Sequence, residues 1–308
     1  MNRIAYPNVR QIRTAFLVTA LGGLLFTFDL PLLRLSEADQ WTMVFTRGIF
    51  LFLAISLFWF ATRKSDTDNT PYIAGRAGVL VAVTSTIGNM AYIGAVVHTN
   101  AANVVFIIAL TPVIAAALSR IILGERVHWL TWAATVLAFI GVGIIAWDGI
   151  HAGKFTGDVL ALVSAFCSAS AFTVVRATGK KVATSLAVGS LSSAFIALIF
   201  FQVSLPSLML DGHFGIPAWV WLGLNGFIAI PLATIFLARG PRVLPSADVS
   251  MFFMLETVLT PVWIWLIFGE MPGQTVLAGG SIVIATLIFH RFWRLYVTAS
   301  AKPLPQEY

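Results

Sequence analysis

The feature that most constrains this chain is an internal repeat. Residues 100–125 match residues 245–270 when the two segments are aligned at an offset of 145 residues. Identical residues fall at Ala102/Ala247, Val104/Val249, Leu110/Leu255, Val113/Val258, Ile122/Ile267, Gly124/Gly269 and Glu125/Glu270. Because the offset is nearly half of the 308 residues, the sequence predicts two copies of one unit, residues 1–150 and residues 151–308.

The composition places both copies in a lipid bilayer. Hydrophobic residues make up 58% of the chain and charged residues only 10%, with a mean hydropathy of +0.90. That leaves too little polar surface to cover a water-soluble globule of this length. Apolar stretches of about 20 residues, each able to cross about 30 Å of hydrocarbon as a helix, recur along the chain. We therefore expect an all-α integral membrane protein.

Charged, proline and glycine breaks divide the sequence into ten expected transmembrane helices, five in each repeat. The expected spans are residues 13–33, 41–61, 76–97, 100–122, 127–147, 156–177, 184–205, 218–239, 247–268 and 274–295.

The basic residues predict how these spans are oriented. With the N-terminus inside, sixteen of the 19 lysines and arginines fall on the inner side, leaving Arg34, Arg47 and Lys154 at or near the outer face. Basic residues collect in cytoplasmic loops, so we expect both termini in the cytoplasm and the protein in the inner (plasma) membrane. Because each repeat crosses the membrane an odd number of times, five, the second copy is inserted in the opposite orientation to the first. Inverted repeats are typical of secondary transporters, whose substrate site lies near the midplane.

Other classes of function are disfavoured by the same pattern. The basic residues are scattered through short loops and form no stripe for nucleic acid, so no nucleic-acid partner is expected. The five histidines and one cysteine lack metal-ligand spacing, and no glycine-rich phosphate loop follows a strand. We expect no metal site, no cofactor and no ATP hydrolysis within the chain.

The repeated segments resemble a known family. The run from Ala109 to Leu118, closing on Leu123-Gly-Glu-Arg126, and Leu255-Glu256, closing on Phe268-Gly-Glu270, are similar to the paired EamA motifs of the drug/metabolite transporter superfamily. Arg47, early in the second span, fits the same pattern. Thr257 departs from it, because the family usually has proline after the glutamate, and here Pro261 follows four residues later. The overall likeness to YddG-type amino-acid exporters implies a ten-helix exporter of small metabolites.

Two charged residues are expected at one depth in the membrane. Asp29 lies in the first span and Arg47 in the antiparallel second span, each roughly 8 to 10 Å below the outer surface at 1.5 Å per residue. One interpretation is an ion pair that is structural or acts as a gate. The other is a clamp in which Arg47 attracts the carboxylate of an amino acid.

Further polar residues are candidates for the substrate site, because a polar group at membrane depth is costly without a partner. Glu256, near the middle of the ninth span, is either a proton-coupling group or a protonated acid bonded to a neighbouring helix. Asn100 and Asn103 begin the fourth span, where helix capping and substrate contact are both open.

A cavity of mixed character is expected around these groups. The residues predicted to line it are Asn89, Tyr92 and Asn225 as polar groups, with Phe106, Phe172, Met251 and Phe252 as aromatic or thioether surfaces. The alternative for each is an ordinary interhelical hydrogen bond or core packing.

The sequence thus favours a secondary transporter or facilitator that exports small amphipathic molecules, with amino acids, including aromatic and neutral ones, as the expected small-molecule substrate. Alternating access would open a central cavity between the two repeats. A second transporter hypothesis is efflux of lipophilic cations neutralised by Glu256. From a different class, an intramembrane lipid-modifying enzyme would need a nucleophile and a base at one depth, which the expected depths of Asp29 and Glu256 do not provide.

The inverted arrangement predicts opposite accessibility for two loops. Cysteines introduced into residues 148–155 should be labelled from outside, and those in residues 178–183 only from inside. Substituted-cysteine labelling in a background without Cys167 measures this. Labelling of both loops from the same side would contradict the inversion.

Overall fold

The structure is a computed structural model, and it describes residues 9–63, 72–73, 75–124, 129–151, 153–178, 183–239 and 246–300. Every regular element in these ranges is helical. The first repeat contains α1 (Val9–Phe26), α2 (Asp29–Leu35), α3 (Gln40–Arg63), α4 (Gly75–His98), α5 (Ala101–Ile108), α6 (Thr111–Leu123) and α7 (Trp129–His151). The second contains α8 (Phe155–Thr178), α9 (Ala183–Phe200), η1 (Leu205–Met209), η2 (His213–Gly215), α10 (Ala218–Gly223), η3 (Leu224–Ala229), α11 (Ile230–Arg239), α12 (Ser246–Phe268) and α13 (Gln274–Ser300).

Seven segments of the described chain are long and apolar enough to cross a membrane. They are Leu17–Leu35, Gln40–Thr62, Gly75–His98, Ala101–Ile122, Phe155–Val175, Ala183–Phe200 and Ala218–Phe236. The three other expected spans coincide with α7, α12 and α13, where shorter apolar stretches are found. Large apolar side chains such as Leu57, Ile122 and Ile199 are more than 60% exposed, as expected for helices surrounded by lipid.

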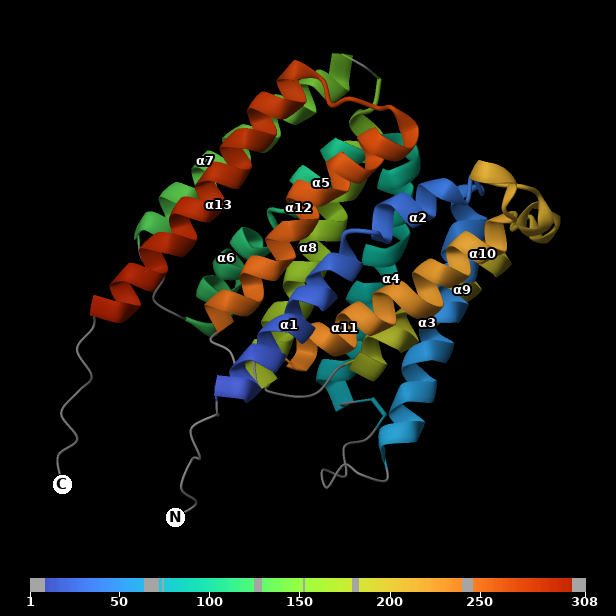
Figure 1. Ribbon diagram of the computed structural model, residues 1–308, viewed down its shortest axis with the longest axis horizontal. Coiled ribbons are helices and arrows are strands. Elements are labelled where there is room, and N and C mark those ends of the chain that lie inside the picture. Colours follow the sequence, from blue (N-terminus) through green and yellow to red (C-terminus); the bar gives the residue numbers. More distant parts are fainter. Residues whose placement is uncertain are drawn as a thin grey trace.

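Helices at equivalent positions of the two repeats pack against each other. Figure 1 shows α7 and α13 side by side along one edge of the molecule, and α3 packs against α9 on the opposite side. The remaining contacts come in related pairs, because α4 packs on α8 just as α11 packs on α1. Helices related by the 145-residue offset in the sequence therefore make equivalent contacts in the structure.

The equivalent helices run in opposite directions. Gly141 of α7 contacts Gly279 and Val283 of α13, whereas Ile145, one turn later in α7, clusters with the earlier residue Val276. Likewise, Trp41 at the start of α3 stacks on Phe201, just after the end of α9. Antiparallel packing of equivalent helices is the arrangement that an inverted repeat requires.

Three of the expected spans are interrupted. The first breaks between α1 and α2, the fourth between α5 and α6, and the eighth contains the π-helical segment η3. At the first break, Thr260 of α12 donates a hydrogen bond to the Thr27 carbonyl (3.1 Å), and Trp263 donates to the Thr27 hydroxyl (3.0 Å). Such partners are needed because water is absent at membrane depth. At the break between α5 and α6, Pro112 lies in the first turn of α6. Because proline has no backbone N–H, this position leaves no donor without a partner.

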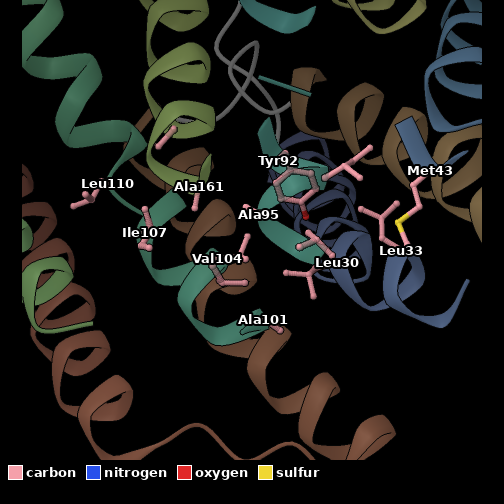
Figure 2. Close-up of a cluster of buried hydrophobic side chains, with 14 of the residues drawn as sticks. Leu30, Leu33, Met43, Tyr92, Ala95, Ala101, Val104, Ile107, Leu110 and Ala161 are labelled. Carbon is pink, nitrogen blue, oxygen red and sulfur yellow. The ribbon is translucent and has the colours of Figure 1, made fainter. Parts of the chain in front are cut away.

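The largest apolar core lies where these interrupted spans meet. Figure 2 shows Leu30 and Leu33 of α2 together with side chains from α3, α4, α5 and α8. Leu33 and Val104 are fully buried, and small residues such as Ala161 allow the helices to approach closely. The core fixes the position of α2 next to α4, and so fixes the polar groups that α2 carries.

The contact between α7 and α13 leaves no room for a side chain at Gly141, where a Cβ atom would lie 2.8 Å from the Gly279 carbonyl oxygen. We expect Gly141→Ala to destabilise the protein by about 1–3 kcal/mol, because the helices must separate. Gly143→Ala, on the same helix with open space around it, is the matched control and should have little effect. Thermal unfolding in detergent measures both, and equal melting temperatures would contradict the packing.

Candidate functional site

A buried polar cluster lies where α2, α3, α4, α9 and η3 meet. Its members, hereafter the Arg47 cluster, are Asp29, Arg47, Asn89, Ser193 and Asn225. Asp29, Arg47 and Asn225 are 4%, 7% and 0% exposed. Asp29, Arg47 and Asn89 belong to the first repeat, and Ser193 and Asn225 to the second. The two repeats are therefore joined by hydrogen bonds inside the protein.

The guanidinium of Arg47 is held from three sides. Its Nη2 donates to both carboxylate oxygens of Asp29 (3.0 and 2.9 Å), which is the ion pair proposed from the sequence. Its Nε donates to Asn225 Oδ1 at 3.0 Å, and its Nη1 donates to Asn89 Oδ1 at 2.8 Å. Charge-assisted bonds of this kind stabilise a buried arginine that would otherwise be too costly.

The two asparagines are also engaged through their amide nitrogens. Asn225 Nδ2 donates to the Asp29 carboxylate at 2.7 Å and to the Asp29 carbonyl at 2.9 Å, so it also satisfies the backbone at the start of α2. Asn89 Nδ2 donates to the Ser193 hydroxyl at 2.9 Å, which in turn donates to the Ser190 carbonyl. In this conformation, both amides are interhelical links.

The local backbone explains how Asn225 reaches the cluster. Asn225 lies in the π-helical segment η3, a local widening of the helix that is frequent at functional sites. The next residue, Gly226, packs on α3, where a Cβ atom would lie 3.1 Å from the Arg47 carbonyl oxygen. A small residue is needed there for the close approach.

Tyr92 and Glu256 adjoin the Arg47 cluster. The guanidinium carbon of Arg47 lies 5.1 Å from the centre of the Tyr92 ring, a cation–π contact. The Tyr92 hydroxyl is buried and lies close to the Asp29 carboxylate. Glu256, on α12, is partly buried and close enough to interact electrostatically with Tyr92, Asp29 and Arg47.

Two of the aromatic residues expected around the cavity, Phe106 and Phe172, have different surroundings in the structure. Phe106 is buried between α5 and α13, where its ring leaves no space for a side chain at Gly280. Phe172 on α8 is 53% exposed. Met251 and Phe252 lie on α12 before Leu255, and their side chains are outside the described part of the structure.

Asn100 and Asn103 belong to a second polar group. Asn100 occupies the N-cap position of α5, but its side chain forms no cap and instead accepts a hydrogen bond from Lys154 at 2.6 Å. Asn103 donates to Asp158 (3.1 Å) and to Thr99 (3.3 Å). The capping hypothesis for Asn100 is therefore wrong, because its amide oxygen accepts from Lys154, just before α8, and not from a backbone N–H of α5.

Contacts at the end of the molecule where α2 ends were not foreseen. Arg34 donates to both Glu270 oxygens (2.8 and 2.7 Å) and to the Thr99 carbonyl, and His213 contacts Glu37 at 3.0 Å. The sequence carried one signal for these contacts: Arg34 and Glu270 have opposite charges, and both lie in loops expected on the same side of the membrane. In the described residues, no group of three or more histidines, cysteines and acidic residues is arranged to hold a metal ion.

The seven helices that are long and apolar enough to cross a membrane indicate a multi-pass membrane protein. The model of the EamA-like transporter family matches the chain twice, over residues 5–147 and 155–291. The chain belongs to this family, within the drug/metabolite transporter superfamily.

Curated relatives include transporters of two kinds. The chain is 29% identical over 61% of its length to a probable terminal-alkyne amino-acid exporter of Streptantibioticus cattleyicolor, and 23% identical over 58% to the S-adenosylmethionine uptake transporter of Rickettsia prowazekii. These matches span 63% and 58% of the relatives' own lengths. A solved crystal structure shares the fold, with a TM-score of 0.59 and 14% identity over 91% of this chain and 99% of the other.

The ion pair at the centre of the Arg47 cluster predicts a large effect of breaking it. Arg47→Ala should cost about 3–5 kcal/mol and reduce transport, because Asp29 is left buried and unpaired. The double variant Asp29→Ala/Arg47→Ala should recover part of that loss. Thermal unfolding of the purified protein measures both.

The control is Arg76→Ala, because Arg76 is exposed in the first turn of α4 and lies outside the Arg47 cluster, so its removal should change the stability by less than about 0.5 kcal/mol. An Arg47→Ala protein as stable and active as this control would contradict a role for the pair.

Proposed function

We propose that the protein exports α-amino acids and related small amphipathic molecules across the inner (plasma) membrane by alternating access. In this proposal, ten transmembrane helices form two inverted five-helix repeats, with both termini in the cytoplasm. The antiparallel packing of α3 on α9 and of α7 on α13 supports the inversion. The substrate would pass between the repeats, where the Arg47 cluster lies.

The observation that carries this proposal is the position of Glu256 beside a polar cluster shared by both repeats. The charges of Asp29 and Arg47 neutralise each other, and the two asparagines bond to them. Glu256 makes no hydrogen bond or ion pair with any other described residue, so its carboxylate is available to a substrate ammonium. Substrate sites of inverted-repeat transporters lie where the two repeats meet.

The two relatives support the same substrate class. One is described as an amino-acid exporter and the other transports S-adenosylmethionine, which also carries an α-amino and a carboxyl group. The part common to both substrates is the α-amino-acid group. We take that group as the portion recognised here, with the side chain packed against apolar surface.

Alternating access requires contacts that form in one state and break in the other. The bonds from Arg34 to Glu270 and to the Thr99 carbonyl join the end of α2 to the loop after α12 and to the end of α4. These elements close the expected outer end. Opening that end would separate Arg34 from Glu270, an exposed pair that is inexpensive to break.

A second candidate is efflux of lipophilic cations. The observation that favours it is the same partly buried carboxylate of Glu256, which would neutralise a cation without any need for a carboxylate-binding group. The two candidates share a site and differ in the chemistry of the substrate.

Transport by purified protein in liposomes tests the proposal. Labelled amino acids should be taken up saturably, whereas sugars should not, and lipophilic cations should compete weakly. Glu256→Gln should abolish any dependence of uptake on a pH gradient, because the glutamine cannot exchange a proton. Glu37→Gln, an exposed glutamate at the expected outer end, is the control. Saturable uptake of cations without uptake of amino acids would support the second candidate instead.

A further inference from the structure

A hollow in the molecular surface lies where α3 begins and α9 ends. It has a volume of about 730 Å³ and is lined by Asp39, Trp41, Phe200, Phe201, Gln202, Ser204 and Ser207. Asp39 and Trp41 belong to the first repeat, and the other lining residues belong to the second. The hollow therefore lies on the contact between α3 and α9 that joins the two repeats.

Contacts between the two repeats fix the walls of this hollow. The ring of Trp41 stacks on that of Phe201, with the ring centres 3.5 Å apart. The backbone N–H of Ser204 donates to the Thr42 hydroxyl at 2.9 Å, and the Ser207 hydroxyl donates to the Ser204 carbonyl at 2.6 Å. The chain that follows α9 is thus bonded to the first turn of α3, which gives the hollow a defined shape.

The hollow lies at the boundary of the apolar part of the molecule. One segment able to cross a membrane begins at Gln40, and another ends at Phe200. On one side of this boundary, Ile199 and Phe200 are 69% and 74% exposed, as expected for side chains that contact lipid tails. On the other side lie the exposed polar residues Asp39 and Gln202. This is the level at which lipid headgroups lie and at which tryptophan is enriched.

The charge of the hollow comes from Asp39. Its Oδ1 accepts from the backbone N–H groups of Trp41 and Thr42, at 3.0 Å each, and so caps α3. Its Oδ2 accepts no hydrogen bond from any described residue, and the lining residues include no lysine or arginine. A carboxylate beside an indole ring attracts a cation through its charge and through the cation–π interaction. The hollow therefore favours an ammonium group and disfavours an anion.

We propose that this hollow binds the headgroup of phosphatidylethanolamine, with the acyl chains of the lipid along the exposed end of α9. The primary ammonium donates a hydrogen bond to Oδ2 of Asp39 and lies against Trp41, and the Ser204 hydroxyl donates to the phosphate. Phosphatidylcholine has no N–H to donate, and phosphatidylglycerol carries a net negative charge that Asp39 repels. This inference does not depend on which substrate the protein transports.

Thermal unfolding of the purified full-length protein tests the proposal, in detergent micelles that contain a rising fraction of one added lipid. Dioleoyl phosphatidylethanolamine should raise the melting temperature saturably, because a lipid that binds the folded state stabilises it. Dioleoyl phosphatidylcholine and dioleoyl phosphatidylglycerol should do so only at higher fractions. In Asp39→Asn, the fraction of phosphatidylethanolamine that gives half of the maximal rise should increase by about fivefold, as expected for an exposed ion pair. Asparagine keeps the helix cap and removes the charge, so the variant remains folded.

Asp211→Asn is the matched control, because Asp211 is exposed in the same connection between α9 and α10 but does not line the hollow. Its response to phosphatidylethanolamine should equal that of the wild-type protein. Equal stabilisation by all three lipids would overturn the inference, as would an unchanged response in Asp39→Asn.

O-phosphoethanolamine, the headgroup without acyl chains, separates a lipid site from a site for soluble amines. It should leave the melting temperature unchanged, because it cannot contact the apolar end of α9. A saturable rise as large as that given by the lipid would show a site for a soluble amine and overturn the assignment to lipid.

Discussion

Burying the charge of Arg47 is the constraint on which the rest of this structure depends. A guanidinium at membrane depth is stable only if its positive charge is neutralised and its donors are bonded. Asp29 supplies the charge, and Asn89 and Asn225 supply the acceptors. These partners come from three different helices and from both repeats, so the requirement of one side chain fixes the relative positions of α2, α3, α4 and η3. Departures from regular helix at α2 and η3 occur where this requirement is met.

Much of the fold follows from features that are local in sequence. Helix length and the repeat at an offset of 145 residues come directly from apolar periodicity and identity, and the helices of the structure lie within a few residues of the expected spans. Interruptions at Thr27–Phe28 and in η3 could not be foreseen, because they depend on partners far away in the chain. Thr260 and Trp263 form hydrogen bonds to Thr27 at the first interruption. Asn225 lies in the second and bonds to Arg47 from there.

Only part of the site could be predicted from the sequence. Charged residues at membrane depth are rare enough to be recognised individually, which is why Asp29, Arg47 and Glu256 were singled out. Which residues satisfy one another depends on side-chain direction, and this depends on packing. Ser193 was missed because serine is common in transmembrane helices, and Asp158 was missed because it lies near the end of its helix. Phe106 was expected at a cavity wall, and it fills a helix contact instead.

The break in the first span has a consequence for how the molecule divides into moving bodies. Thr27 is bonded to α12 and Asp29 to η3, so the start of α2 is held to the second repeat by buried hydrogen bonds, whereas Arg34 near its other end holds Glu270 through an exposed pair. By sequence, α2 belongs to the first repeat. A rigid half that carries α2 along with α12 would therefore not coincide with either gene-duplicated unit. The duplication copied one block of chain, but the first span of that block, α1 as well as α2, packs on helices of the other block.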